Sequence, residues 1–122
     1  MTPMRTFFIL PALLTASLLG VPQEPETPPL TIKVRPELAT SPGSVRLTAM
    51  VDPHENNRRL TLSADSGTYY RSSTVQLDGE AAPREHAMLF THLPAGKYTL
   101  EARLGRSDGS EIVEDLEVLV VE

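Results

Sequence analysis

Three histidines are the residues of this chain best suited to bind a metal ion or to transfer a proton. His86 and His92 are six residues apart, so a continuous strand would place them on one face, about 20 Å from each other. That separation is too long for a single metal ion. His54 lies between Asp52 and Glu55 in a turn, where the three side chains could contact a cation, but a solvated turn is the simpler interpretation. We therefore predict no metal site.

The other residue types used in catalysis or metal binding are either absent or lack the neighbouring residues that such sites require. The chain has no cysteine, which excludes disulfides, thiolate catalysis and cysteine-bound zinc. Ser72 and Ser73 have none of the neighbouring motifs that activate a serine nucleophile. The carboxylates of residues 111–122 are spread along one predicted strand, without the spacing of a calcium loop. We predict no catalytic residue, no cofactor and no enzymatic activity.

A tyrosine pair is the best candidate for contact with a ligand or partner. Tyr69 and Tyr70 are adjacent, and neighbouring strand residues point to opposite faces, so one should pack and the other should meet solvent. An exposed tyrosine near Arg71 and Arg58 could stack on a sugar or anchor a protein. The alternative is a tyrosine at the edge of the core with its hydroxyl in water. These four residues are the predicted contact site.

Charge and length limit the partners. The 122 residues carry a formal net charge of −5, with 16 acidic and 11 basic residues. No basic stripe is available to neutralise a phosphate backbone, so nucleic acid is excluded as a partner. The length allows one domain with a modest core.

The N-terminal segment has the form of a secretory signal peptide. Arg5 precedes an apolar run that is too short to span a bilayer and is interrupted by Pro11, so residues 1–20 are predicted to be removed, with cleavage near Ser17 or Gly20. Residues 21–29 are rich in proline and form a predicted extended tether. The mature protein is expected to be periplasmic or secreted, without a stable membrane span.

Apolar residues recur at every second position in short runs from residue 30 to residue 122, which predicts strands rather than helices. Turn residues separate the runs, and Asp108-Gly109 is the best hairpin candidate. Seven runs predict a seven-stranded antiparallel sandwich of immunoglobulin type. The runs begin at Leu30, Val45, Leu60, Val75, His86, Tyr98 and Leu116.

The stretch from Phe90 to Leu100, FTHLPAGKYTL, resembles the passage between two strands in fibronectin type III and bacterial immunoglobulin-like domains. The resemblance implies that Leu93 packs in the core, that Gly96 opens the turn, and that Tyr98 forms a corner whose hydroxyl bonds back to the loop. It also implies a scaffold that hosts adhesion, assembly or carbohydrate-binding roles.

Two functions follow as expectations. The first is an exported, non-enzymatic interaction or assembly module that presents loops or a sheet edge to an unknown protein partner. The alternative is a small ligand-binding domain for a carbohydrate or a metal ion, centred on the tyrosine pair or on the turn from Asp52 to Glu55.

Overall fold

The computed structural model describes residues 27–122, so the predicted signal peptide and most of the predicted tether lie outside the described residues. The described part consists of strands, turns and one short 3-10 helix. Their bounds are β1 (Leu30–Arg35), β2 (Leu38–Thr40), β3 (Gly43–Val51), β4 (Asn57–Asp65), β5 (Tyr70–Gln76), η2 (Gly79–Ala81), β6 (Glu85–Leu93), β7 (Gly96–Arg106) and β8 (Glu111–Val121).

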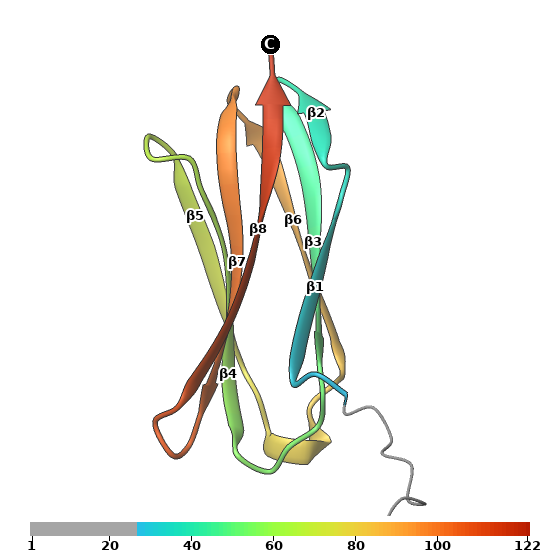
Figure 1. Cartoon of the computed structure of the whole chain (residues 1–122), viewed down its shortest axis with the longest axis vertical. Helices are drawn as coiled ribbons and strands as arrows, with labels where there is room; N and C mark the ends of the chain where they lie inside the picture. The colour runs from blue at the N-terminus through green and yellow to red at the C-terminus, as the bar shows by residue number, and fades with distance from the viewer. Residues whose placement is uncertain (1–26) are drawn as a thin grey trace, which may run out of the picture.

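The strands form two facing sheets (Figure 1). The smaller sheet has the order β1-β3-β6, and the larger has the order β2-β8-β7-β4-β5. All neighbouring strands are antiparallel except β2, which runs parallel to β8. The chain is therefore an all-β sandwich, as the strand periodicity predicts.

Alternating residues of both sheets fill the space between them. On β4 the side chains of Leu60, Leu62 and Ala64 are buried, and Leu100 and Ala102 of the neighbouring β7 are fully buried beside them. The sequence predicted these inward positions correctly, because a period of two places one apolar set on one face.

The predicted strand count is wrong, since the described residues form eight strands rather than seven. The additional strand, β2, has only three residues and follows β1 closely. The predicted strand at Val75 instead spans Tyr70 to Gln76, and every residue of it is exposed. An edge strand with polar residues on both faces has no apolar alternation to reveal it.

The Leu-Pro-Ala-Gly-Lys-Tyr stretch carries the chain from β6 in one sheet to β7 in the other. Tyr98 is fully buried, and its hydroxyl donates a hydrogen bond to the carbonyl oxygen of Pro94 at 2.7 Å. Burial raises the pKa of the Tyr98 hydroxyl, which keeps it a neutral donor. The predicted tyrosine corner and the buried Leu93 are confirmed.

The predicted role of Gly96 as the residue that opens the turn is not seen in its backbone, because its φ is not in the left-handed region. The left-handed residue here is His92, with φ of 58°. It lies where β6 carries an extra residue relative to β3, between the pairs Val45–Phe90 and Gly43–Leu93. This bulge ends the regular ladder just before the chain changes sheets.

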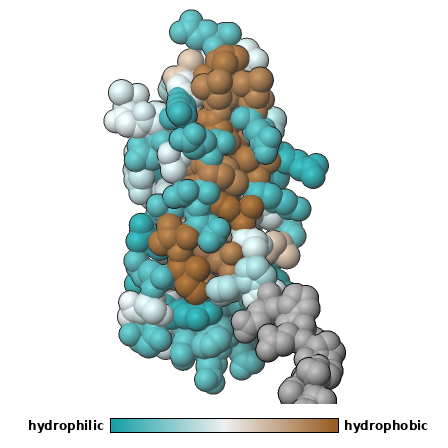
Figure 2. Space-filling model, in the orientation of Figure 1, coloured by the Kyte–Doolittle hydropathy of each residue, from teal (hydrophilic) through white to brown (hydrophobic). Residues whose placement is uncertain are grey.

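Apolar surface is exposed along one side of the sandwich (Figure 2). β8 and β2 lie at the front of this view in Figure 1. The exposed large hydrophobic residues of these two strands are Leu38, Val113, Leu119 and Val121. Within residues 27–122, no helix is long and apolar enough to cross a membrane.

Candidate functional site

A pocket of about 220 Å³ lies on the smaller sheet, and three of its six lining residues are cationic. β1 and β3 supply most of its wall, and β6 supplies one carboxylate at its border. The lining residues are Lys33, Val34, Arg35, Arg46, Thr48 and Glu85.

Strand alternation directs these cations outward. Val34 of β1 and Leu47 of β3 point into the core and are buried, so the residues on either side of them point to the outer face of the sheet. Lys33 and Arg35 therefore share the outer face of β1, and Arg46 lies on the outer face of β3.

The strand register sets two arginines directly opposite each other. Arg35 of β1 pairs with Arg46 of β3, and Lys33 pairs with Thr48. Side chains at directly opposed positions have Cβ atoms about 5 Å apart, and like charges there destabilise a sheet. The chain keeps three positive charges within two rows of one ladder, although its formal net charge is −5.

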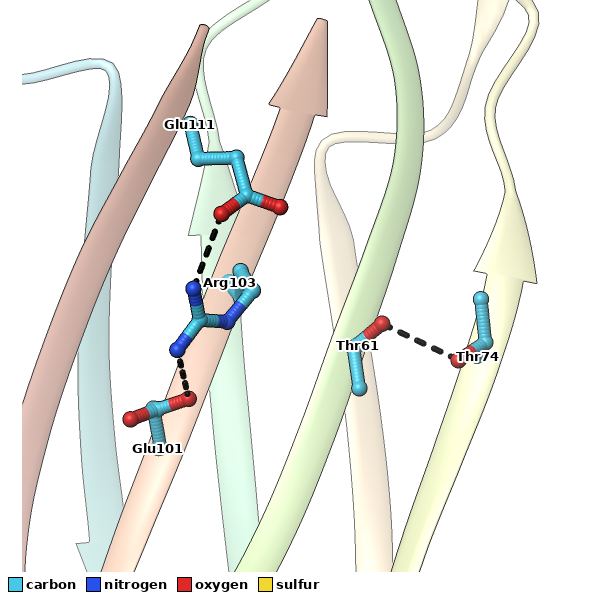
Figure 3. Close-up of polar contacts among 5 residues, drawn as sticks. All are labelled: Thr61, Thr74, Glu101, Arg103 and Glu111. Carbon is cyan, nitrogen blue, oxygen red and sulfur yellow. Dashed lines mark hydrogen bonds and ion pairs between the residues drawn. The ribbon is translucent and has the colours of Figure 1, made fainter. Parts of the chain in front are cut away.

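Within residues 27–122, no carboxylate lies within 4.0 Å of these three cations. Arg84, Lys97 and Arg103 form ion pairs elsewhere in this part of the chain, whereas Arg58, Arg71 and Arg106 have neutral hydrogen-bond partners. Arg103 contacts Glu101 at 3.0 Å and Glu111 at 2.8 Å on the outer face of the larger sheet (Figure 3). The cations of the pocket are thus available to an external anion.

Thr48 and Glu85 complete the pocket. Thr48 is only 7% exposed although it lies on the outer face, because longer side chains stand around it. Because the Thr48 side chain is short, space remains between Lys33 and Arg46, and this space is the pocket. The Thr48 hydroxyl lies at the bottom of the pocket. Glu85 pairs with Met50 one row beyond Thr48, so its carboxylate borders the pocket at the end away from Arg46.

The structure separates the residues of the predicted tyrosine site. Tyr69 is half-buried and packs edge-to-face on Tyr98, with ring centroids 6.0 Å apart, while Tyr70 is 62% exposed. One tyrosine packs and the other meets solvent, as predicted. Arg71 donates a hydrogen bond to the Tyr69 hydroxyl at 3.1 Å.

Arg58 does not join the tyrosines. It lies at the start of β4, whereas Tyr70 pairs with Asp65 at the opposite end of that strand, about 23 Å away along the sheet. Its guanidinium donates hydrogen bonds to the carbonyl oxygens of Glu55 and Asn57 at 2.7 and 2.8 Å. Arg58 therefore anchors the preceding turn.

The histidines and carboxylates considered for a metal do not converge. Asp52 pairs with Arg84 at 3.8 Å, and His54 accepts a hydrogen bond from the Asn56 amide at 3.0 Å. His86 contacts the carbonyl oxygen of Pro83 at 2.8 Å. Across residues 27–122, no three His, Asp or Glu side chains gather as a metal site would require.

Solved structures that resemble this chain include an enzyme. The superoxide reductase (neelaredoxin) from Ignicoccus hospitalis matches with a TM-score of 0.59 at 17% sequence identity, covering 75% of this chain and 79% of that one. A variant of that enzyme gives a TM-score of 0.59 at 18% identity, covering 75% and 81%. Murine CRIg matches at a TM-score of 0.42 and 16% identity, covering 75% of this chain and 96% of that one.

Sequence comparisons add no relative. No family model matches the chain, and no curated protein matches it. At identities below 20%, the two superoxide reductase matches show a shared fold alone.

These matches correct the predicted function. We expected a non-enzymatic interaction module, because the sequence shows no motif that would activate a catalytic residue. The same fold carries superoxide reductase, an enzyme, so that expectation is contradicted.

The residues present do not fit a redox-active metal of the kind that one-electron chemistry would use. The chain has no cysteine, and the described His, Asp and Glu residues form no cluster of three. No redox step can be derived from this set of side chains.

Sequence reasoning missed the cationic pocket. Its only signal in the sequence is the Lys33 and Arg35 pair at alternate positions of one predicted strand. Arg46 joins them through the register of the next strand, which alternation does not specify.

Proposed function

We propose that this protein binds a small anionic ligand in the pocket formed by Lys33, Arg35 and Arg46. The observation that carries the proposal is the directly opposed pair Arg35–Arg46, which has no carboxylate within 4.0 Å among the described residues. Two opposed arginines destabilise the sheet in the absence of a ligand. A bound anion would neutralise their charge, which would explain why the pair is present.

The chemistry of the lining defines the ligand class. Arginine forms paired, charge-assisted hydrogen bonds with planar or tetrahedral oxyanions, so a carboxylate, phosphate or sulfate group suits Arg35 and Arg46. Thr48 supplies a hydroxyl at the floor, and Glu85 at the border favours a ligand that also carries a hydroxyl or ammonium donor. A volume of about 220 Å³ limits the ligand to a small molecule.

Calorimetric titration tests the proposal with phosphate, sulfate and a small hydroxycarboxylate as probes. Arg46→Gln keeps a side chain of similar length and removes one charge, so it should weaken anion binding about 10- to 100-fold, as expected for loss of a charge-assisted hydrogen bond. The matched control is Arg59→Gln, which removes a cation that lies on the larger sheet. It should leave the affinity unchanged.

Two results would contradict the proposal. One is the absence of measurable binding for all three probes at low salt. The other is equal weakening by both substitutions, which would indicate attraction to general positive charge rather than to the pocket.

Finer features of the fold and of its location are also proposals. The passage between sheets and the corner hydrogen bond of Tyr98 support assignment of the sandwich to the immunoglobulin or fibronectin type III group. The apolar run before Gly20 supports export, with the ligand met in the periplasm or outside the cell. Labelling the N-terminus of the mature protein would show whether cleavage occurs near Ser17 or Gly20.

A further inference from the structure

β5 is a free edge of the larger sheet. It pairs only with β4, lies at the outer margin of the sandwich (Figure 1), and is exposed at each of its residues. Edge strands are commonly protected by proline, by lysine, by a bulge or by short length. β5 has seven residues, contains neither proline nor lysine, and keeps an unbroken register with β4. Its one charged residue, Arg71, pairs with the buried Ala64 and so lies on the inward side of the strand, which is its single protective feature.

The hydrogen bonds that flank β5 show which of its backbone groups are free. The Leu77 amide donates a hydrogen bond to the backbone carbonyl oxygen of Arg58 at 2.8 Å. The Ser66 amide donates one to the backbone carbonyl oxygen of Tyr69 at 2.9 Å. In an antiparallel ladder the bonded residues alternate, so the odd-numbered residues of β5 face β4. The backbone N–H and C=O groups of Tyr70, Ser72, Thr74 and Gln76 therefore point away from the sheet.

We infer that β5 pairs antiparallel with β5 of a second copy of this chain, with the twofold axis at Ser73. In this register Tyr70 faces Gln76 of the second copy, and Ser72 faces Thr74 of the second copy. All four outward-facing residues of each strand then exchange backbone hydrogen bonds. The two larger sheets, of five strands each, become one continuous sheet.

The side chains of β5 are compatible with themselves in this register. Arg71 is the one charged residue of the strand, and it faces Val75 of the second copy, so like charges are not opposed. On the outer face, Thr61 and Thr74 already share a hydroxyl hydrogen bond of 3.0 Å (Figure 3). Self-pairing extends this row to Ser72 and then Ser63 of the second copy, which gives four hydroxyl residues in line.

A second copy fits this edge because one register about Ser73 pairs every outward-facing backbone group of both strands and sets no like charges opposite each other. The inference is independent of anion binding, because the pocket lies on the other sheet.

Charge substitutions at the twofold axis test the inference with the full chain. Ser73 would lie opposite Ser73 of the second copy, and it is exposed, so a charge there should leave each monomer folded. Sedimentation at protein concentrations from about 5 to 500 µM should show a dimer of the wild type, within the affinity expected for a small interface. Ser73→Lys alone and Ser73→Glu alone should remain monomeric, and an equal mixture of the two should dimerise again.

Each result of the sedimentation experiment either supports or overturns pairing through β5. Recovery of the dimer in the mixture supports pairing about Ser73, with thermal unfolding of each variant confirming that it is folded. A wild type that stays monomeric at 500 µM overturns the inference, including when a strand-forming peptide binds the edge instead. A dimer that persists in both single variants, or a mixture that stays monomeric, overturns this register.

Discussion

At the scale of the residue, Tyr98 joins the core to the loop between the sheets. Its ring is fully buried and contacts Tyr69 edge-to-face, and its hydroxyl holds the carbonyl of Pro94. Loss of this hydrogen bond would leave a buried polar group without a partner, which destabilises the folded state.

Tyr98→Phe should therefore lower the free energy of unfolding by about 1 kcal/mol. Tyr70→Phe is the matched control, because Tyr70 is largely exposed, and it should change stability by less than about 0.5 kcal/mol. Urea denaturation of both variants measures the difference. Equal midpoints for the Tyr98 variant and the wild type would contradict the corner assignment.

His92 carries backbone strain that its side chain does not offset. Its φ of 58° is in the left-handed region, and its side chain is exposed. His92→Gly should raise the free energy of unfolding by about 0.5 kcal/mol, since glycine adopts this conformation without the Cβ penalty.

His86→Gly provides the comparison for that substitution. It places glycine inside β6, where no left-handed conformation is required, and it should destabilise the protein by about 0.5–1 kcal/mol. Thermal unfolding of both variants measures the two effects. A destabilised His92→Gly variant would show that the histidine side chain contributes more than its backbone costs.

At the scale of the element, the turn between β7 and β8 is organised by one carboxylate. Asp108 accepts hydrogen bonds from the Ser110 hydroxyl at 2.6 Å and from the Ser110 amide at 2.9 Å, and Gly109 has a φ of 89°. The predicted Asp-Gly hairpin is confirmed, because β7 and β8 pair on either side of this turn. The Ser110 hydrogen bonds lower the pKa of Asp108 below the ordinary value of an aspartate.

This pKa shift predicts a loss of stability in acid. A carboxylate with a depressed folded pKa stabilises the protein above its unfolded pKa, and that contribution disappears as the pH falls through the folded value. Asp108→Asn should therefore show a flatter decrease in melting temperature between about pH 5 and pH 2 than the wild type. Asp115→Asn removes the same charge from β8 and serves as control. Parallel curves for the Asp108 variant and the wild type would contradict the assignment.

The opposed arginines of β1 and β3 make a second prediction at this scale. Without ligand, Arg46→Gln should raise the free energy of unfolding by about 0.3 kcal/mol, because it removes a like-charge pair. Denaturation at low ionic strength should show the gain, and added salt should reduce it by screening. A loss of stability would mean that Arg46 contributes favourable contacts in the free protein.

The sequence predicted some elements well and others poorly, for physical reasons. Inward positions such as Leu60 and Leu62 follow from alternation, because one face of a buried sheet must be apolar. β5 was misplaced because edge residues are solvated on both faces. The pocket was missed because Arg35 and Arg46 meet through a register that period-two patterning leaves open.

At the scale of the whole molecule, the two sheets present different surfaces. The larger sheet carries paired charges such as Arg103 with Glu101, and it ends in the free edge of β5. The smaller sheet carries the cationic pocket. Ligand binding and self-pairing would therefore occur on separate faces, and an anion that binds only the folded state would raise the melting temperature by mass action.

Amide chemical shifts recorded during titration with phosphate and a small hydroxycarboxylate test whether the pocket of Lys33, Arg35 and Arg46 binds an anion. We predict that the largest changes fall on Lys33–Arg35 and Arg46–Thr48, that they saturate, and that saturation needs about 10- to 100-fold more anion in Arg46→Gln. Small shifts spread over both sheets, or saturable shifts centred away from β1 and β3, would contradict the assignment of this pocket as the anion site.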